Sequence, residues 1–122
     1  MPIQLEQLSY VYMQGSTLAQ RAVEDISLTI EAGEFLGLIG HTGSGKSTLV
    51  QLMGGLLQPA AGRVLVDGLD LADKKQRAQA RRGVGLVFQY PEYQLFEETV
   101  AKDVAYGPRN MGFGEKEIEA AV

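Results

Sequence analysis

The chain has 122 residues, a formal net charge of −4 and an apolar content of 45%, which is ordinary for a protein with a packed core. No window reaches the roughly 18 uncharged apolar residues that a membrane-spanning helix needs. The absence of cysteine excludes disulfide bonds and thiolate metal sites. The amino terminus lacks the features of a secretory signal, and the acidic balance argues against nucleic acid as a main partner.

The first 34 residues predict a small antiparallel β region. Apolar and polar side chains alternate along residues 3–12, IQLEQLSYVY, and along residues 22–30, AVEDISLTI, as they do in half-buried strands. A turn around Gly33 follows. We assign residues 35–88 to a core of strands and helices, and residues 89–122 to a loop and the start of a helical subdomain.

Two short apolar runs predict strands that are buried on both faces, as in a parallel sheet. They are residues 35–40, FLGLIG, and residues 84–88, VGLVF. Between and after them we expect a buried helix within residues 46–57 that is closed by Gly54 and Gly55, a strand near 63–66, and helices over 74–82, 99–108 and 114–122.

The last two of these helices carry boundary signals. Thr99 is a good helix N-cap, and Gly107-Pro108 is expected to stop the helix that Thr99 begins. The final helix places Ile118, Ala121 and Val122 on one face, with nothing in the sequence for that face to pack on. We therefore expect the chain to be a truncated form of a longer protein.

Residues 40–47, GHTGSGKS, fit the phosphate-loop pattern G-x-x-x-x-G-K-[ST] in full. Gly40, Gly43 and Gly45 permit backbone angles at which successive N–H groups converge on phosphate oxygens. The helix that follows adds the positive end of its dipole. An apolar run enters the loop and a helix leaves it, which is the context that this pattern requires.

The side chains of the loop have separate expected tasks. Lys46 places a cation between the β- and γ-phosphates, Ser47 offers Mg²⁺ a hard oxygen ligand, and Thr48 can bond the α-phosphate. The loop positions Thr42 and Ser44 complete the cradle. His41, the only histidine, is expected to lie near the phosphates as a loop residue and not to act as a catalytic base.

Gln89 follows the apolar run 84–88 directly. Ligands bind beyond the carboxyl ends of strands in open α/β sheets, so Gln89 is expected near the same crevice as the loop. Its amide can coordinate Mg²⁺ or orient an attacking water, and the alternative is a plain loop residue. The aromatic and apolar side chains just beyond it indicate either a protein interface or a local core: Tyr90, Tyr93, Leu95 and Phe96.

A basic run, KKQRAQARR, occupies residues 74–82 without an acidic residue. A solvated helix face is the simpler interpretation. The alternative is a contact with anionic lipid headgroups or with an acidic partner.

The segments GHTGSGKST (40–48) and VGLVFQYPEYQLFEETVAKDVAYGPRNMG (84–112) resemble the ATP-binding-cassette (ABC) ATPases, and more narrowly the ATPases of energy-coupling factor (ECF) transporters. FQYPEYQLFEETV is closer to the second of the two paralogous ATPase subunits than to the first. The resemblance covers the whole chain. It implies an α/β P-loop NTPase core with an antiparallel β subdomain, and a parent that couples ATP hydrolysis to uptake of vitamins or transition-metal ions.

The resemblance also implies roles for residues. Residues 40–47 match the Walker A loop of the family, with Thr48 beside it, which implies ATP and Mg²⁺ as ligands. Gln89 matches the Q-loop glutamine, which touches Mg²⁺ and the attacking water. Tyr12 falls where the family has an aromatic ring that stacks on adenine. The alternative for Tyr12 is a core residue, and Tyr10 is the better candidate for that place.

Family members work with partners at the cytoplasmic face of the membrane. The resemblance implies a paralogous ATPase subunit, a transmembrane coupling protein and a substrate-binding membrane protein, so that the chain is peripheral to the membrane. The segment after the Q-loop lines a groove for coupling helices in this family. That makes Tyr90, Tyr93, Leu95 and Phe96 the expected partner surface.

The chain departs from the family by lacking the signature motif, the Walker B strand with its catalytic glutamate, and the switch histidine. We expect weak nucleotide binding, no meaningful ATP turnover, and self-association through unpaired sheet edges. Two alternatives remain: the ATPase of another ABC transporter branch, which would need a different groove surface from YPEYQLFEE, and a non-catalytic nucleotide-binding module, which the open last helix argues against.

Overall fold

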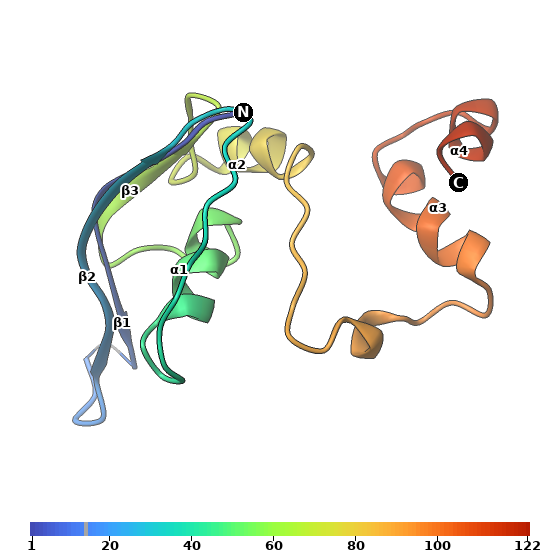
Figure 1. The fold of residues 1–122 in the computed structure, drawn as a ribbon. Helices are drawn as coiled ribbons and strands as arrows, with labels where there is room; N and C mark the ends of the chain where they lie inside the picture. The colour runs from blue at the N-terminus through green and yellow to red at the C-terminus, as the bar shows by residue number, and fades with distance from the viewer. Residues whose placement is uncertain (14) are drawn as a thin grey trace. The chain divides into compact units, whose positions relative to one another are not determined.

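Two compact units, Met1–Gly85 and Leu86–Val122, make up the computed structural model, which describes residues 1–13 and 15–122 (Figure 1). The first unit contains β1 (Ile3–Tyr12), β2 (Gln20–Ile30), α1 (Lys46–Met53), β3 (Ala61–Val66), β4 (Leu69–Asp70) and α2 (Lys74–Arg81). The second contains the 3₁₀ helix η1 (Pro91–Gln94), α3 (Val100–Asn110) and α4 (Glu115–Ala121). Among the described residues no helix is both long enough and apolar enough to cross a membrane.

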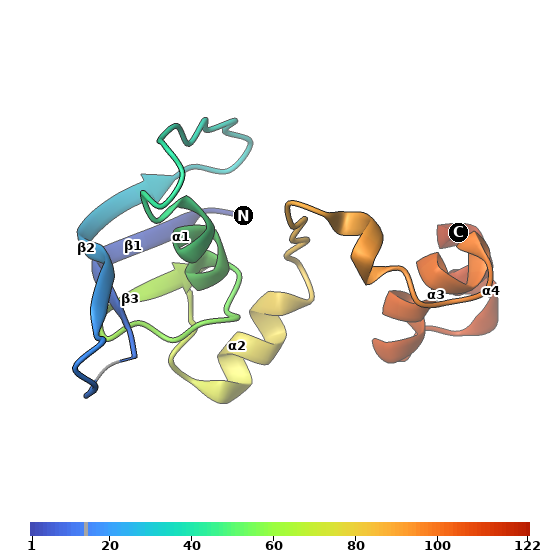
Figure 2. The same ribbon diagram turned by 90° about the horizontal axis from the view of Figure 1, so that it is seen from below.

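A four-stranded antiparallel sheet forms the first unit, in the order β2-β1-β3-β4. Leu5 at its centre pairs with Leu28 of β2 on one side and with Val64 of β3 on the other. Helix α1 lies against one face of this sheet (Figure 2). The core is made of buried side chains from that face and from the helices: Leu5, Leu8, Val23, Leu49, Leu52, Val64, Val66, Leu71 and Ala80.

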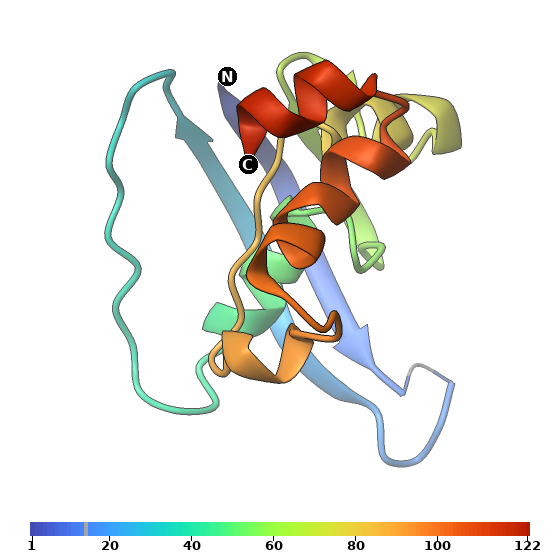
Figure 3. The same ribbon diagram turned by 90° about the vertical axis from the view of Figure 1, so that its right-hand side faces the viewer.

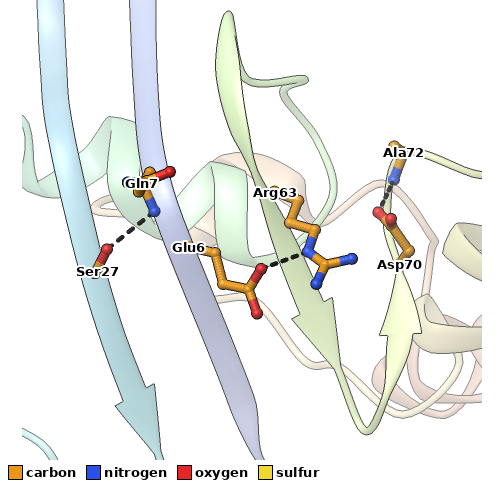
Figure 4. Close-up of polar contacts among 6 residues, drawn as sticks. All are labelled: Glu6, Gln7, Ser27, Arg63, Asp70 and Ala72. Carbon is orange, nitrogen blue, oxygen red and sulfur yellow. Dashed lines mark hydrogen bonds and ion pairs between the residues drawn. The ribbon is translucent and has the colours of Figure 1, made fainter.

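Paired bulges in β1 and β2 interrupt the alternation of buried and exposed side chains. Gln7 and Asp25 have left-handed φ values of 48° and 46°, and the strand register shifts in this region. The Gln7 N–H donates to Ser27 Oγ at 3.0 Å (Figure 4), and the Asp25 N–H donates to Ser9 Oγ at 2.9 Å. Serine hydroxyls thus satisfy N–H groups that the bulges take out of the strand ladder.

The exposed face of the sheet carries a cross-strand ion pair. Glu6 and Arg63 are opposite one another on β1 and β3, and the guanidinium Nε donates to the Glu6 carboxylate (Figure 4). This hydrogen bond, and then the charge of Glu6, raise the pKa of Arg63 above its ordinary value. Both side chains are about half exposed, at 53% and 47%, so solvent screening leaves the pair a small share of the stability.

Most of the elements expected in the first unit are confirmed. The helices over 46–57 and 74–82 are present as α1 and α2, and the strand near 63–66 is β3. Helix α1 ends at Met53 with Gly54 as its C-cap, which confirms the expected closure of the helix by Gly54 and Gly55. The turn at Asp67-Gly68 joins β3 to β4 with both residues at positive φ, as in a type I′ hairpin turn.

The helices of the second unit begin where the sequence indicates, but one of them ends later. Thr99 caps α3, with its hydroxyl accepting from the Lys102 N–H at 3.3 Å, and Gly114 is the N-cap of α4. The expected stop at Gly107-Pro108 is wrong, because α3 continues through Pro108 to Asn110. Proline removes only its own N–H donor there, and the Met111 N–H still donates to the Gly107 carbonyl at 3.0 Å.

The two buried strands expected over residues 35–40 and 84–88 are not formed. Phe35 and Ile39 are 99% and 97% exposed, and Val87 is 77% exposed. A strand needs a neighbour to receive its backbone hydrogen bonds, and across residues 1–13 and 15–122 all strand pairing lies within the antiparallel sheet. Most apolar side chains of the two runs therefore face solvent, whereas Val84 packs against the core of the first unit.

Mutation of a buried side chain is expected to change the free energy of unfolding much more than mutation of exposed side chains. Leu52 is 1% exposed, so Leu52→Ala is expected to lower the free energy of unfolding by about 2–5 kcal/mol. The double variant Phe35→Ser/Ile39→Ser removes two exposed side chains and is expected to change it by less than about 0.5 kcal/mol. Urea unfolding followed by circular dichroism measures both. A large loss in the double variant would mean that residues 35–40 are buried in solution.

Unpaired apolar runs also predict self-association of the 122-residue chain, because free edges and exposed side chains recruit further chains. Multi-angle light scattering is expected to find dimers or larger species. Phe35→Ser/Ile39→Ser is expected to shift the distribution towards monomer. A monodisperse monomer of the unsubstituted chain at the same concentration contradicts this expectation.

Candidate functional site

The loop over residues 40–45 carries the chain into α1 and lies against the sheet at one point. Gly43 and Gly45 have φ values of +85° and +97°, in the region that favours glycine. A Cβ on Gly45 would lie 2.5 Å from the carbonyl oxygen of Ala22 in β2. A Cβ on Gly40 would lie 2.6 Å from Ser44 Oγ. The backbone contact and the positive φ therefore require glycine at residue 45, whereas at residue 40 the contact is with a side chain that can rotate away.

The N-terminus of α1 presents N–H groups that have no acceptor within the helix. Gly45 is its N-cap and has no side chain to cap it, and the first bond into the helix runs from Leu49 N to Gly45 O at 2.9 Å. The N–H groups of Lys46, Ser47 and Thr48 precede that bond. Free N–H groups and the positive end of the helix dipole together favour an anion at this end.

The Lys46 side chain folds back over the loop. Its ammonium Nζ donates to the carbonyl oxygens of Gly40 and His41, the latter at 2.8 Å, and reaches Ser44 Oγ at 3.4 Å. Within residues 1–13 and 15–122 it forms no ion pair with a carboxylate. The charge of Lys46 is thus held at the loop by neutral acceptors and remains available to an anion.

Tyr12 joins the end of β1 to the first turn of α1. Its hydroxyl lies 2.6 Å from Thr48 Oγ1, and Thr48 is only 5% exposed. The Tyr12 ring is 40% exposed and packs edge-on against Tyr10, with ring centroids 4.9 Å apart. Tyr10 packs against the hydrophobic core. The structure therefore brings Tyr12, and not Tyr10, to the loop through a contact that the sequence did not reveal.

The remaining loop residues are exposed. Ser47 lies on the first turn of α1 with its side chain open to solvent. His41 Nδ1 lies 2.9 Å from the Thr42 carbonyl oxygen, and the Ser44 N–H closes a turn on the His41 carbonyl at 3.1 Å. No group of three or more histidine, cysteine or carboxylate side chains suited to a metal ion occurs in the described part of the chain. A hydroxyl such as that of Ser47 is thus the kind of metal ligand that the loop offers.

Gln89 and the aromatic residues beyond it belong to the second unit. Gln89 is exposed, and its Nε2 donates weakly to the Tyr90 hydroxyl at 3.4 Å. Tyr90 and Tyr93 lie close together, with ring centroids 5.6 Å apart. Phe96 packs edge-on against Tyr106 of α3 at 4.8 Å. These contacts leave much of each side chain in solvent: Tyr90 is 54%, Tyr93 82%, Leu95 68% and Phe96 61% exposed.

The basic run lies on α2 and the residue after it. Arg77 donates to the Leu71 carbonyl at 3.1 Å and packs with Arg81 beside Gly55, so part of the run has a structural task. Lys74 and Lys75 are exposed at the start of the helix. In the described ranges the run makes no ion pair.

Sequence reasoning missed two residues that contribute to these arrangements. Ala22 supplies the carbonyl against which Gly45 packs, and no sequence pattern marks a backbone contact of this kind. Tyr106 extends the aromatic surface onto α3 through Phe96. The feature that could have indicated Tyr106 is its place as an aromatic residue on a helix that also exposes Val100 and Val104.

Comparison with known protein families and sequences identifies proteins that are related to this chain. A family model described as "ABC transporter" matches residues 23–121. The chain is 59% identical over 123 aligned residues to the energy-coupling factor transporter ATP-binding protein EcfA2 of Symbiobacterium thermophilum, and 54% identical to EcfA2 of Clostridium acetobutylicum. Both alignments cover 100% of this chain and 43% of the relative, so the chain spans less than half the length of these relatives.

Solved structures agree with this match. The ATP-binding cassette MJ0796, as a dimer bound to ADP and Pi, superposes with a TM-score of 0.80 at 26% identity, over 97% of this chain and 53% of that one. CbiO1 from Clostridium perfringens, part of the ABC transporter complex CbiONQ, has a TM-score of 0.77 at 38% identity, over 97% and 46%. The expected fold class and the resemblance to ECF ATPases are confirmed, and the chain belongs to the ABC transporter family.

Proposed function

We propose that this chain is the nucleotide-binding part of the ATP-binding subunit of an ECF importer, which couples ATP hydrolysis to uptake of vitamins or transition-metal ions. One observation carries the proposal: the loop over residues 40–48 combines free N–H groups at the N-terminus of α1 with the Lys46 ammonium held over it. Such an arrangement complements the charge of a polyphosphate. Similarity to EcfA2 proteins over the whole chain supports the rest.

The residues present fit ATP with Mg²⁺. The N–H groups of the loop and the Lys46 ammonium have no carboxylate competing for them within the described ranges, so they can bond phosphate oxygens. Ser47 Oγ is exposed and can serve as a metal ligand, and the amide oxygen of Gln89 is the second candidate. When bound, Mg²⁺ neutralises charge on the phosphates. The half-exposed ring of Tyr12 is the proposed surface for adenine.

What the loop contributes to phosphoryl transfer is positioning and charge. Lys46 holds the transferred phosphate and offsets its charge, while the N–H groups fix its orientation. Among the described residues the His41 ring contacts only the Thr42 carbonyl, and it is not aligned by a carboxylate as a catalytic base would be. We therefore propose that this chain binds nucleotide and that hydrolysis needs groups from the rest of the parent subunit and from a paralogous ATPase subunit.

The exposed aromatic surface of the second unit is the proposed contact with a transmembrane coupling protein. Its members, Tyr90, Tyr93, Leu95 and Phe96, are all more than half exposed. Large apolar side chains gathered in solvent are typical of protein interfaces. Through this contact, and through a substrate-binding membrane protein beyond it, the subunit would be held at the cytoplasmic face of the membrane without crossing it.

The two apolar runs over residues 35–40 and 84–88 fit this proposal. We propose that the remaining length of the parent supplies the strands that pair with them. Relatives are more than twice as long as this chain, since it covers 43% of them. Paired in that way, the runs would become the buried strands that their composition favours.

Nucleotide binding is the direct test. Titration calorimetry of ATP into the 122-residue chain with Mg²⁺ is expected to detect binding, and Lys46→Ala is expected to weaken it at least about tenfold because a charge-assisted hydrogen bond is lost. Lys116→Ala, which removes an exposed cation on α4, is the matched control and is expected to bind as the unsubstituted chain does. No binding by the unsubstituted chain contradicts the proposal.

Turnover should be absent in the same preparation. With saturating MgATP, phosphate release by the 122-residue chain is expected to stay at the level of buffer alone, because among the described residues no carboxylate bonds to a side chain of the loop to act with it on a water. The control is Lys46→Ala, which fixes the background from any contaminating ATPase. Release that exceeds the background and disappears in Lys46→Ala would show that the loop alone suffices for hydrolysis.

A further inference from the structure

The hydrogen bond between Tyr12 and Thr48 is not explained by a stacking role for Tyr12. Stacking on a base uses the face of the ring, which phenylalanine also supplies. The structure instead directs the Tyr12 hydroxyl to Thr48 Oγ1 at 2.6 Å, a short O–H···O contact across 36 positions of the chain. Tyr10 lies edge-on beside it, and in residues 1–13 and 15–122 no hydrogen bond of its hydroxyl is found. The two neighbouring tyrosines therefore differ in what their hydroxyls do.

Thr48 lies where its hydroxyl proton can be donated to an anion at the N-terminus of α1. It lies in the first turn of α1, beside the N–H groups of Lys46 and Ser47 that have no acceptor in the helix. Its side chain is 5% exposed and Oγ1 has one protein partner among the described residues, the Tyr12 hydroxyl. A threonine hydroxyl accepts and donates at the same time. Thr48 can thus accept from Tyr12 and still donate to an anion at the helix end.

A bound anion determines which of the two hydroxyls, Tyr12 or Thr48, donates in the hydrogen bond between them. Phosphate oxygens without protons only accept hydrogen bonds, so a bound phosphate takes the single proton of Thr48. Thr48 Oγ1 is then left as an acceptor, and the only proton available between the two hydroxyls is that of Tyr12. The chain becomes Tyr12 O–H to Thr48 O–H to phosphate, in which each bond polarises and strengthens the next.

We propose that Tyr12 is a positioning residue for the polyphosphate site, which acts through its hydroxyl on Thr48 and so strengthens the bond from Thr48 to a phosphate oxygen. The inference rests on the proposed function, since it requires that the loop over residues 40–48 binds a polyphosphate. It adds to Tyr12 an action at the phosphate end of the ligand that is separate from any contact between its ring and a base.

The test compares a ligand with a base and a ligand without one. Tyr12→Phe keeps the ring and removes only the hydroxyl. Titration calorimetry with Mg²⁺ and either ATP or inorganic tripolyphosphate is expected to give about tenfold weaker binding of both ligands to Tyr12→Phe, from the loss of one cooperative hydrogen bond. Tyr10→Phe, the neighbouring ring with the same chemical change, is expected to bind both ligands as the unsubstituted chain does.

A double-mutant cycle separates positioning from simple structural support. Thr48→Val keeps the shape of Thr48 and removes its hydroxyl, so Tyr12→Phe is expected to have no further effect on tripolyphosphate binding in that background. Thermal unfolding of each variant is followed in parallel. An unchanged affinity with a lowered unfolding midpoint in Tyr12→Phe would overturn the inference, because the bond would then serve stability alone.

The remaining outcomes distinguish this inference from the proposed function. Failure of the unsubstituted chain to bind either ligand overturns both. Binding by the unsubstituted chain with no change in Tyr12→Phe overturns only the inference. A loss for ATP without a loss for tripolyphosphate also overturns it, since Tyr12 would then act at the base. The same loss from Tyr12→Phe in the Thr48→Val background overturns the route through Thr48.

Discussion

At Gly45 the loop meets the sheet, and a Cβ there would lie 2.5 Å from the Ala22 carbonyl oxygen of β2. Only glycine permits this approach at a φ of +97°, and the approach sets where α1 begins. Leu49 and Leu52, one and two turns later, then reach the core beneath the sheet. The position of the phosphate loop thus follows from the antiparallel sheet, although none of its residues belongs to a strand.

The loop is held together by neutral groups, which leaves its positive charge uncompensated. The Lys46 ammonium bonds to backbone carbonyls, and the Tyr12 hydroxyl bonds to Thr48. A carboxylate in either place would stabilise the loop by itself but would compete with an anion for the same donors. The ion pairs of the described residues, such as Glu6 with Arg63 on the outer face of the sheet, are formed elsewhere. The site is therefore prepared for an anionic ligand.

Much of the local structure follows from the sequence, because it depends on neighbouring residues. The N-cap at Thr99, the hairpin turn at Asp67-Gly68 and the helix start after Gly45 each reflect side chains or glycines within a few positions. The alternation along residues 3–12 predicts the strand β1 but not the bulge within it. Serine hydroxyls on the facing strand satisfy the bulges, and such cross-strand partners depend on register, which alternation alone does not specify.

Apolar content predicted the structure less well in segments that need a neighbouring strand in order to form. Residues 35–40 have the composition of a buried strand, yet Phe35 and Ile39 lie in solvent. Composition records what a segment favours when it is paired, whereas a strand exists only where another strand accepts its hydrogen bonds. The helical run through Pro108 is the converse case, since packing and the bond to Gly107 outweigh one missing donor.

By itself, the sequence determined the phosphate loop, its lysine and hydroxyl residues, and most helices, because these depend on residue type at short spacing. Figure 3 shows the long connection from β2 to α1, which contains the phosphate loop. Only the tertiary structure decided that Gly45 rests on Ala22, that Tyr12 reaches Thr48, and that the apolar run before the loop stays unpaired. Contacts between distant segments depend on register and on the presence of a partner, and neither is written in any short stretch of residues.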